Sequence, residues 1–235
     1  MPGDKGNNKQ FESHQEVIQS LEKFAIALQN NAKAENSQKV VASILSWTNL
    51  DLPAMEVIMA LIERSNATIA LNQEQDTVDA IVTQQLIQQW EDEKLDQGLF
   101  LRKIRDSLLN DKEVTSLLEL YSKIHENKVM GDRSIENTSH ITTLLNLKLI
   151  AEVKGTLNVS NGLYRKVFNL TWVEEKIKER KPYISKFREW MQSQDPSQLL
   201  RGAELEEAIE CADEQELSDD EHKFLIRSQV ADCTP

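Results

Sequence analysis

Apolar residues recur at intervals of three and four along most of this chain, and that spacing gathers them on one face of a helix. The run Val17, Leu21, Phe24 and Leu28 is one example. Residues that interrupt helices are scarce, because the 235 positions include only 7 Gly and 5 Pro, against usual shares of roughly 7% and 5%. The sequence therefore predicts a mainly α-helical fold.

The apolar stripes and their flanking residues also set the expected helix limits. Pro53 suits the first turn of a helix, where its missing N–H would be unpaired anyway. Ser218 is a typical N-terminal cap, and Glu221 follows at the spacing of a capping box. The expected helices span about 11–30, 37–47, 53–65, 75–91, 100–109, 114–124, 135–147, 203–212 and 218–230, with a further helical stretch over 168–190 that is interrupted at Lys181-Pro182.

One stretch departs from the helical spacing. Residues 149–153 alternate with period two, Lys154-Gly155-Thr156 supplies a turn, and a second short strand runs from Leu157 toward Asn161-Gly162. Two predicted helices, 114–124 and 135–147, come directly before these strands. Helix, helix, strand, turn, strand is the order of a winged helix, so we expect one over 111–170 with a two-stranded β wing.

Composition and charge divide the chain into four expected parts. Residues 1–10 lack apolar periodicity and are predicted to be disordered. A helical region over 11–110 precedes the winged helix over 111–170, and a helical connector and tail follow over 171–235, with a linker at Asp195-Pro196-Ser197. The net charge is −6 over residues 1–110, +1 over 111–170 and −7 over 171–235, which gives the −12 of the whole chain.

We expect no catalytic site, cofactor or metal. A phosphate-binding loop needs Gly-x-x-x-x-Gly-Lys-Ser/Thr after a strand, and the sequence lacks it. The four His residues lack the setting of a nucleophilic triad. Cys211, His222 and Cys233 are spaced by 11 and 11, unlike a compact zinc site. The acidic runs are expected to form solvated helix faces, because catalytic carboxylates lie in apolar clefts.

Two kinds of partner remain open for the predicted winged helix. Its second helix offers Ser139, His140, Thr142, Thr143 and Asn146 for hydrogen bonds to DNA bases. Phosphate contacts would come from Lys148, Lys154, Arg165 and Lys166 around the wing. Four cations on a chain of charge −12 favour a protein partner over DNA, because the background charge repels phosphate. Tyr164 lies beside these cations in sequence and joins them as a candidate contact.

Features of export and membrane insertion are missing from the sequence. No run of about 18 apolar residues could span a bilayer. Two cysteines make no disulfide framework, and the start of the chain has no cationic apolar leader. We expect a cytoplasmic protein without a membrane segment.

The order of short motifs over roughly residues 40–230 resembles the C-terminal part of bacterial AAA-like ATPases of the STAND signalling class. The motifs are Ser46-Trp47-Thr48 with Pro53, Trp90-Glu91, Leu101-Arg102-Lys103-Ile104-Arg105-Asp106, Leu117-Leu118-Glu119-Leu120-Tyr121, Val153-Lys154-Gly155-Thr156-Leu157-Asn158-Val159, Leu163-Tyr164-Arg165-Lys166-Val167-Phe168-Asn169, Leu199-Leu200-Arg201-Gly202 and Leu217-Ser218-Asp219.

The resemblance implies a helical lid, a winged helix and a helical connector, without the P-loop domain that precedes them in the family. The family's lid carries Thr-Gly-Gly-x-Pro, whose proline approaches adenine. Here Thr48 and Pro53 remain, but Asn49 and Leu50 follow the threonine where the family has its two glycines. We therefore do not expect a nucleotide site at Pro53.

The expectation that follows is a regulatory or adaptor protein without catalytic activity. In the family the winged helix makes an internal protein contact that holds or releases the switch. This chain would act by protein–protein interaction in signal transduction, with an ATPase or signalling effector as its partner. The alternative is a transcription regulator that binds DNA through its winged helix.

Overall fold

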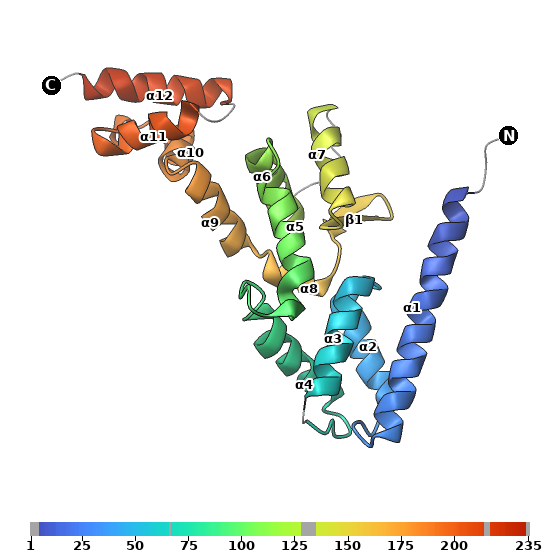
Figure 1. Cartoon of the computed structure of the whole chain (residues 1–235). Helices are drawn as coiled ribbons and strands as arrows, with labels where there is room; N and C mark the ends of the chain where they lie inside the picture. Colours follow the sequence, from blue (N-terminus) through green and yellow to red (C-terminus); the bar gives the residue numbers. More distant parts are fainter. Residues whose placement is uncertain (1–4, 66, 128–134, 214–216, 234–235) are drawn as a thin grey trace.

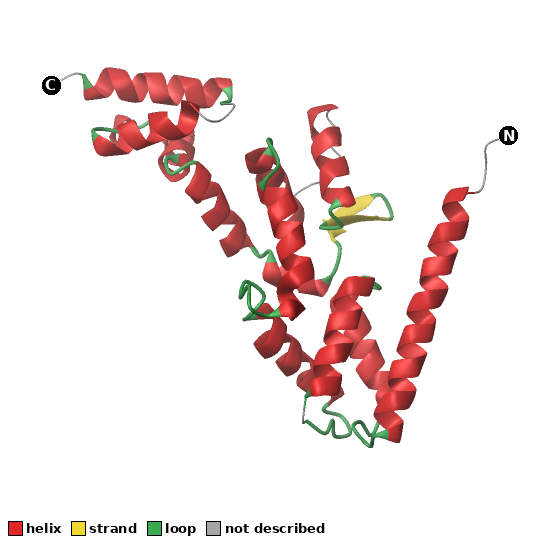
Figure 2. Cartoon of the chain, viewed as in Figure 1, coloured by secondary structure: helices red, strands yellow, loops and turns green. Residues whose placement is uncertain are grey.

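In a computed structural model, the described residues 5–65, 67–127, 135–213 and 217–233 form twelve α-helices and one two-stranded antiparallel sheet (Figures 1 and 2). The mainly α prediction with a short two-stranded wing is confirmed. The elements are α1 (Lys5–Asn30), α2 (Ser37–Thr48), α3 (Leu52–Arg64), α4 (Glu74–Val82), η1 (Thr83–Ile87), η2 (Asp96–Gly98), α5 (Leu99–Leu109), α6 (Val114–His125), α7 (Ile135–Asn146), β1 (Ile150–Val153), β2 (Thr156–Val159), α8 (Gly162–Val167), α9 (Leu170–Arg180), α10 (Ile184–Ser193), η3 (Pro196–Gln198), α11 (Ala203–Asp213) and α12 (Asp219–Asp232).

The first four helices form a bundle in which α2 packs against α1, α3 and α4. α1 begins at Lys5, so the structure places residues 5–10 in a helix where the sequence predicts disorder. Residues 1–4 of that prediction lie outside the described residues. Once the packed part of α1 has formed, each further residue adds a backbone hydrogen bond at low cost. The helix can therefore extend beyond the residues with an apolar pattern.

The predicted helix over 75–91 ends early. α4 gives way after Val82 to a π-helical turn, and the chain then leaves the helix. The buried Arg102 of α5 holds this loop, because its guanidinium donates to the carbonyls of Trp90, Asp92 and Leu95 at 2.8–2.9 Å. Gly98 fits here since a Cβ would lie 2.2 Å from the Trp90 carbonyl oxygen. The loop that follows the helix is thus fixed by a contact from another element.

The β wing is a tight hairpin after α7. Its register pairs Ile150 with Val159 and Val153 with Thr156. The two-residue loop Lys154-Gly155 has φ values of 52° and 77°, and positive φ at both positions is what a type I′ turn requires. The turn prediction is correct. Asn161 then caps α8 by accepting from the Tyr164 N–H at 2.8 Å, so a short helix replaces the predicted strand end at Asn161-Gly162.

One hydrophobic core joins the bundle, the wing region and α9. An aromatic cluster marks this junction: the Phe168 ring lies 5.4 Å from the Trp90 ring and 5.1 Å from the Trp172 ring in edge-on geometry. Trp90 follows the bundle in the chain, while Phe168 and Trp172 flank the start of α9. The predicted regions 11–110 and 111–170 are therefore packed together as one body.

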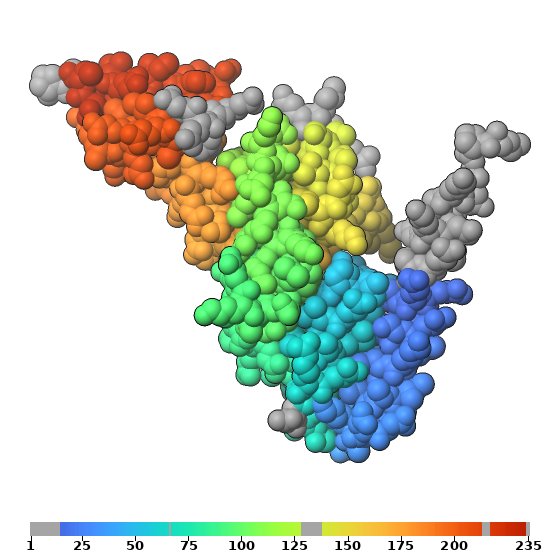
Figure 3. All heavy atoms as spheres, in the orientation of Figure 1, coloured from blue at the N-terminus to red at the C-terminus, as the bar shows by residue number. Residues whose placement is uncertain are grey.

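A second core forms around Phe224 in the C-terminal helices. Tyr183, Trp190, Leu205 and Leu225 are also buried in it. Figure 3 shows α11 and α12 at one end of the molecule, beyond α9. The predicted break at Lys181-Pro182 separates α9 from α10, and the predicted 203–212 and 218–230 helices appear as α11 and α12.

Local caps fix the ends of these C-terminal elements. Ser218 and Glu221 form the predicted capping box, with both reciprocal bonds present. The predicted linker contains a short 3₁₀ turn, η3, which Asp195 caps by accepting from the Ser197 N–H at 2.8 Å. Hydrogen bonds from the backbone and the side chain of Ser197 lower the pKa of Asp195.

Candidate interaction surface

Three of the five predicted contact residues are exposed cations around the hairpin. Lys148 and Lys154 lie in the turns at either end of β1, and Lys166 lies on α8. Lys148 and Lys154 both have left-handed backbones, with φ of 58° and 52°. Their ammonium groups are therefore placed by turn geometry and not by a helix face. These three residues form what we call the hairpin cation surface.

Arg165 is partly buried and tied to α6. Its guanidinium donates to the carbonyl of His125 at 2.8 Å, and the His125 Nε2 lies 3.1 Å from the Arg165 carbonyl oxygen. These reciprocal contacts hold α8 against the end of α6. The Arg165 charge therefore lies at the carbonyl end of α6, where a cation is favourable. The side chain also faces solvent in part.

Tyr164 is a core residue, only 1% exposed. It packs beneath α6, where the Tyr121 hydroxyl lies 3.5 Å from the Tyr164 carbonyl oxygen. Burial and the neighbouring Asp51 carboxylate raise the pKa of Tyr164. The prediction of Tyr164 as a partner or DNA contact is corrected by this burial, because the ring fills the core between the hairpin and the bundle.

The polar face predicted for α7 is only partly available. Ser139, Thr142 and Asn146 are exposed, but the Thr142 hydroxyl donates to the Thr138 carbonyl within the helix at 2.8 Å. His140 is partly buried and its Nε2 lies 3.3 Å from a carboxylate oxygen of Glu113. The α7 residues therefore offer fewer free hydrogen-bonding groups than the sequence suggests.

The loop between α2 and α3 forms the joint between the bundle and the hairpin region. The Asn49 side-chain amide donates to the Ser160 carbonyl at 3.0 Å. A Cβ on Gly162 would lie 3.3 Å from the Ser46 carbonyl oxygen, so α8 begins close against the α2 backbone. Asn49 and Leu50 both have left-handed backbones, with φ of 45° and 66°. The sequence offered no sign of this joint.

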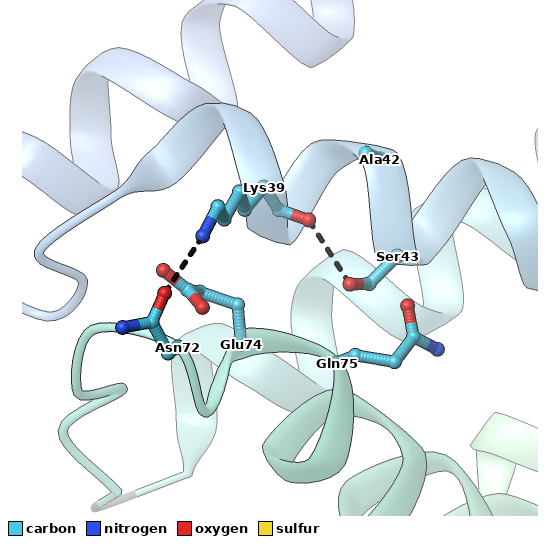
Figure 4. Close-up of a pocket in the computed structure, with 6 residues that line it drawn as sticks. All are labelled: Lys39, Ala42, Ser43, Asn72, Glu74 and Gln75. Carbon is cyan, nitrogen blue, oxygen red and sulfur yellow. Dashed lines mark hydrogen bonds between the residues drawn. The ribbon is translucent and has the colours of Figure 1, made fainter.

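A cavity of about 350 Å³ opens between α2 and the start of α4 (Figure 4). It is lined by Lys39, Ala42, Ser43, Asn72, Glu74 and Gln75. Glu74 is 3% exposed, and its Oε1 has no hydrogen-bond partner among the described residues. The Lys39 Nζ lies 3.0 Å from the Asn72 Oδ1. This cavity was not predicted, since no local sequence pattern marks Glu74 as buried.

A buried polar cluster connects the two hydrophobic cores. The Lys181 Nζ lies 2.5 Å from a carboxylate oxygen of Glu221, and the Tyr183 hydroxyl donates to the same oxygen at 3.2 Å. Burial and the Glu221 carboxylate raise the pKa of Tyr183. Burial would raise the pKa of Glu221, but hydrogen bonds from Lys181 and Ser218 outweigh it and lower that pKa. The cluster fixes α12 to the turn between α9 and α10.

The remaining groups singled out in the sequence are dispersed. Cys211 is partly buried on α11, and Cys233 is exposed at the end of α12 as a free thiol. Within the described ranges, no three or more His, Cys, Asp or Glu residues gather as a metal site would require. In the same ranges, no helix combines the length and apolar character needed to cross a membrane.

Comparison with known proteins shows similarity to a segment of a longer protein. Over 202 residues, or 83% of this chain, it is 29% identical to an uncharacterized WD repeat-containing protein of Synechocystis sp.. The matched part is 16% of that protein's length, so the chain is similar to one segment of a much longer WD repeat-containing protein. No family model matches the chain, and no solved structure matches it.

Proposed function

We propose that this chain is a non-catalytic regulatory module that acts by protein–protein interaction in signal transduction. It would correspond to the lid, winged helix and connector of a STAND-class switch ATPase. The element order supports this assignment, because a helical bundle is followed by α6, α7, β1 and β2 and then by further helices. That is the order of the resembling family after its P-loop domain.

The observation that carries the proposal is the backbone of the loop between α2 and α3. The resembling family has Thr-Gly-Gly-x-Pro in its lid, and here Asn49 and Leu50 follow Thr48. Both residues adopt the left-handed conformation that glycine favours. Leucine rarely adopts it, so its presence supports a backbone inherited from a glycine-bearing loop. The loop has kept its shape while its side chains have changed.

The same loop supports a switching role through its contact with the hairpin region. Asn49 bonds to Ser160, and Asp51 caps α3 by accepting from the Ala54 N–H at 3.1 Å. A movement of this loop would therefore act on β2 and α8 together. In the proposed mechanism, partner binding at the hairpin cation surface and the position of the bundle influence each other through this joint.

The similarity to a WD repeat-containing protein supports a protein partner. In that protein a segment like this chain belongs to a longer chain that also carries WD repeats. Repeats of this type build β-propellers. A helical module covalently joined to other parts of a protein is suited to transmit contacts between them. We propose an ATPase or signalling effector as the class of partner.

Capture from native lysate tests this proposal. The tagged chain is exposed to lysate with nuclease, at physiological and at several-fold higher salt, and retained proteins are identified by mass spectrometry. Salt screens the contacts of the hairpin lysines but not apolar contacts, so a protein partner held by both kinds is retained more weakly at high salt without being lost. We expect a defined ATPase or signalling protein to be retained in both conditions. Retention of nucleic acid alone from lysate without nuclease, lost at high salt, would overturn the proposal.

The second candidate function is DNA binding, which the three exposed lysines of the hairpin cation surface favour. It is tested by fluorescence anisotropy with a random-sequence duplex. The variant Lys148→Glu/Lys154→Glu/Lys166→Glu is compared with Lys23→Glu/Lys94→Glu/Lys103→Glu, which alters exposed lysines elsewhere. If DNA is the partner, only the first variant loses affinity and its salt dependence falls by about three charges. Equal behaviour of both variants removes this candidate.

A further inference from the structure

The cavity between α2 and α4 contains an unusual group: a buried glutamate with one carboxylate oxygen that has no hydrogen-bond donor among the described residues. Glu74 is only 3% exposed, and its Oε1 atom lacks a hydrogen-bond partner among the described residues. An ionised carboxylate removed from water is costly unless it is paired. Buried polar atoms without a protein partner therefore point to a bound molecule or water.

The walls of the cavity are held in place without any ligand. The loop before α4 is bridged to the loop after α1, where the Ile69 N–H donates to the Lys33 carbonyl at 2.7 Å and the Glu35 N–H donates to the Ile69 carbonyl at 3.2 Å. The Lys33 ammonium also donates to the Ser65 carbonyl at 2.6 Å. These contacts fix the segment that carries Asn72 and Glu74. The site is thus largely formed before binding, as small-molecule sites usually are.

Charges of both signs line the cavity. Figure 4 shows the Glu74 side chain extended from α4 toward Lys39 and Asn72, with Gln75 and Ser43 on the other side of the opening. The Lys39 ammonium donates to the neutral amide of Asn72. Because an ammonium has three N–H groups, Lys39 still has donors available. Rotation about the last torsion of Glu74 is soft and can turn either oxygen to the cavity.

We propose that this cavity binds a small zwitterion of the amino-acid class. Its ammonium would donate to the Glu74 carboxylate, and its carboxylate would accept from the Lys39 ammonium and the Asn72 amide. The Ser43 hydroxyl donates to the Lys39 carbonyl and the Gln75 Nε2 donates to Asp79, so these two residues offer their side-chain oxygens as acceptors for the rest of the molecule. A cavity of about 350 Å³ has room for an amino acid. This site is independent of the hairpin cation surface and of the partner proposed there.

Direct binding of named probes tests the proposal. Three probes of matched length are used. β-Alanine carries both charges, n-propylamine carries the positive charge alone, and propionate carries the negative charge alone. A panel of L-amino acids extends the series. Binding is followed by NMR, where cross-peaks of residues 39–43 and 72–75 should shift, and by the rise in Tm that a ligand of the folded state causes. We expect β-alanine to bind more tightly than either single-charge probe.

The variant Glu74→Gln separates ligand binding from a structural role. A hydrogen bond to a charged group contributes about 1.5–3 kcal/mol, which corresponds to roughly a tenfold to hundredfold loss of affinity. Without ligand the variant should be at least as stable as the natural chain, because the Glu74 Oε1 atom makes no hydrogen bond that the substitution would remove. The matched control is Asp76→Asn, an exposed residue in the same helical turn, which should keep full affinity.

Lys39→Gln should remove the advantage of β-alanine over n-propylamine while leaving n-propylamine binding in place. The proposal is overturned if no probe shifts these cross-peaks, which would indicate a bound water only. It is also overturned if Glu74→Gln binds the zwitterion with the same affinity as the natural chain. A loss of stability in that variant, when the natural chain binds no probe, would likewise overturn it.

Discussion

Leu50 has a backbone conformation that its own side chain disfavours. Its φ is 66°, and its side chain is 44% exposed, so little burial compensates for the strain. A left-handed residue other than glycine costs about 1–2 kcal/mol. The strain is located in the loop that contacts Ser160 and begins α3, which is the joint of the proposed switch.

Replacing this leucine should therefore stabilise the protein. Glycine relieves the left-handed strain but adds about 0.5–1 kcal/mol of chain entropy to the unfolded state, so Leu50→Gly is expected to gain about 0.5 kcal/mol. Urea denaturation measures the change. The control is Leu71→Gly, an exposed loop leucine outside the positive-φ residues, which should lose stability. Equal losses in both variants would contradict the strain at Leu50.

Glu221 provides a second residue-scale prediction, which concerns pH. Its pKa is lowered in the folded state, so the folded form binds fewer protons than the unfolded form. The resulting stability is fully present above the ordinary pKa of a glutamate and is lost as pH falls through the lowered value. Glu221→Gln should remove this acid-side dependence in denaturation curves. The control Asp220→Asn alters an exposed carboxylate in the same turn and should preserve it.

At the scale of elements, local sequence patterns account for most helices. Apolar spacing predicts α5, α6 and α12 closely, and the Ser218–Glu221 box is confirmed, because these signals lie within a few residues of each other. α8 was missed although Asn161 precedes it as a cap. The same residue type at Asn169 caps α9 by accepting from the Trp172 N–H at 3.0 Å. The asparagine cap at Asn161 was thus the sequence signal from which α8 could have been predicted.

Elements that depend on distant contacts could not be predicted in this way. The loop over residues 90–95 is held by Arg102, a residue of another helix. Tyr164 was expected at the surface, but the short α8 turns its ring into the core against Asp51. Of the predicted contact residues, Lys148, Lys154 and Lys166 are exposed and Arg165 is bonded to α6. The burial of Glu74 likewise arises from how α2 and α4 pack.

The C-terminal helices should unfold as a unit separate from the rest. Phe224 is fully buried in their core and contacts the rings of Tyr183, Phe187 and Trp190. A buried Phe→Ala change costs about 3–5 kcal/mol. Phe224→Ala should therefore speed hydrogen exchange in α11 and α12 and leave α2 and α6 protected. Equal acceleration throughout the chain would show that the two cores unfold together.

At the scale of the whole molecule, the account describes one body, formed by the bundle and the hairpin region, and a C-terminal unit attached through α9 and α10. The Lys181–Glu221 pair fixes that unit, and the Asn49–Ser160 bond joins bundle and hairpin. The net charge of −12 is spread over the bundle and tail segments, while the middle segment is near neutral. This distribution favours the hairpin region as the place where a protein partner can approach.

The central claim is that the hairpin cation surface contacts a protein, and lysine footprinting tests it most directly. An amine-reactive label is applied to the chain in buffer, in native lysate and in the same lysate after nuclease treatment, and labelled positions are quantified by mass spectrometry. The account predicts that Lys148, Lys154 and Lys166 lose reactivity in the lysate, while Lys23, Lys94 and Lys103 keep it. Protection of the hairpin lysines that disappears with nuclease treatment would contradict the account and assign this surface to DNA.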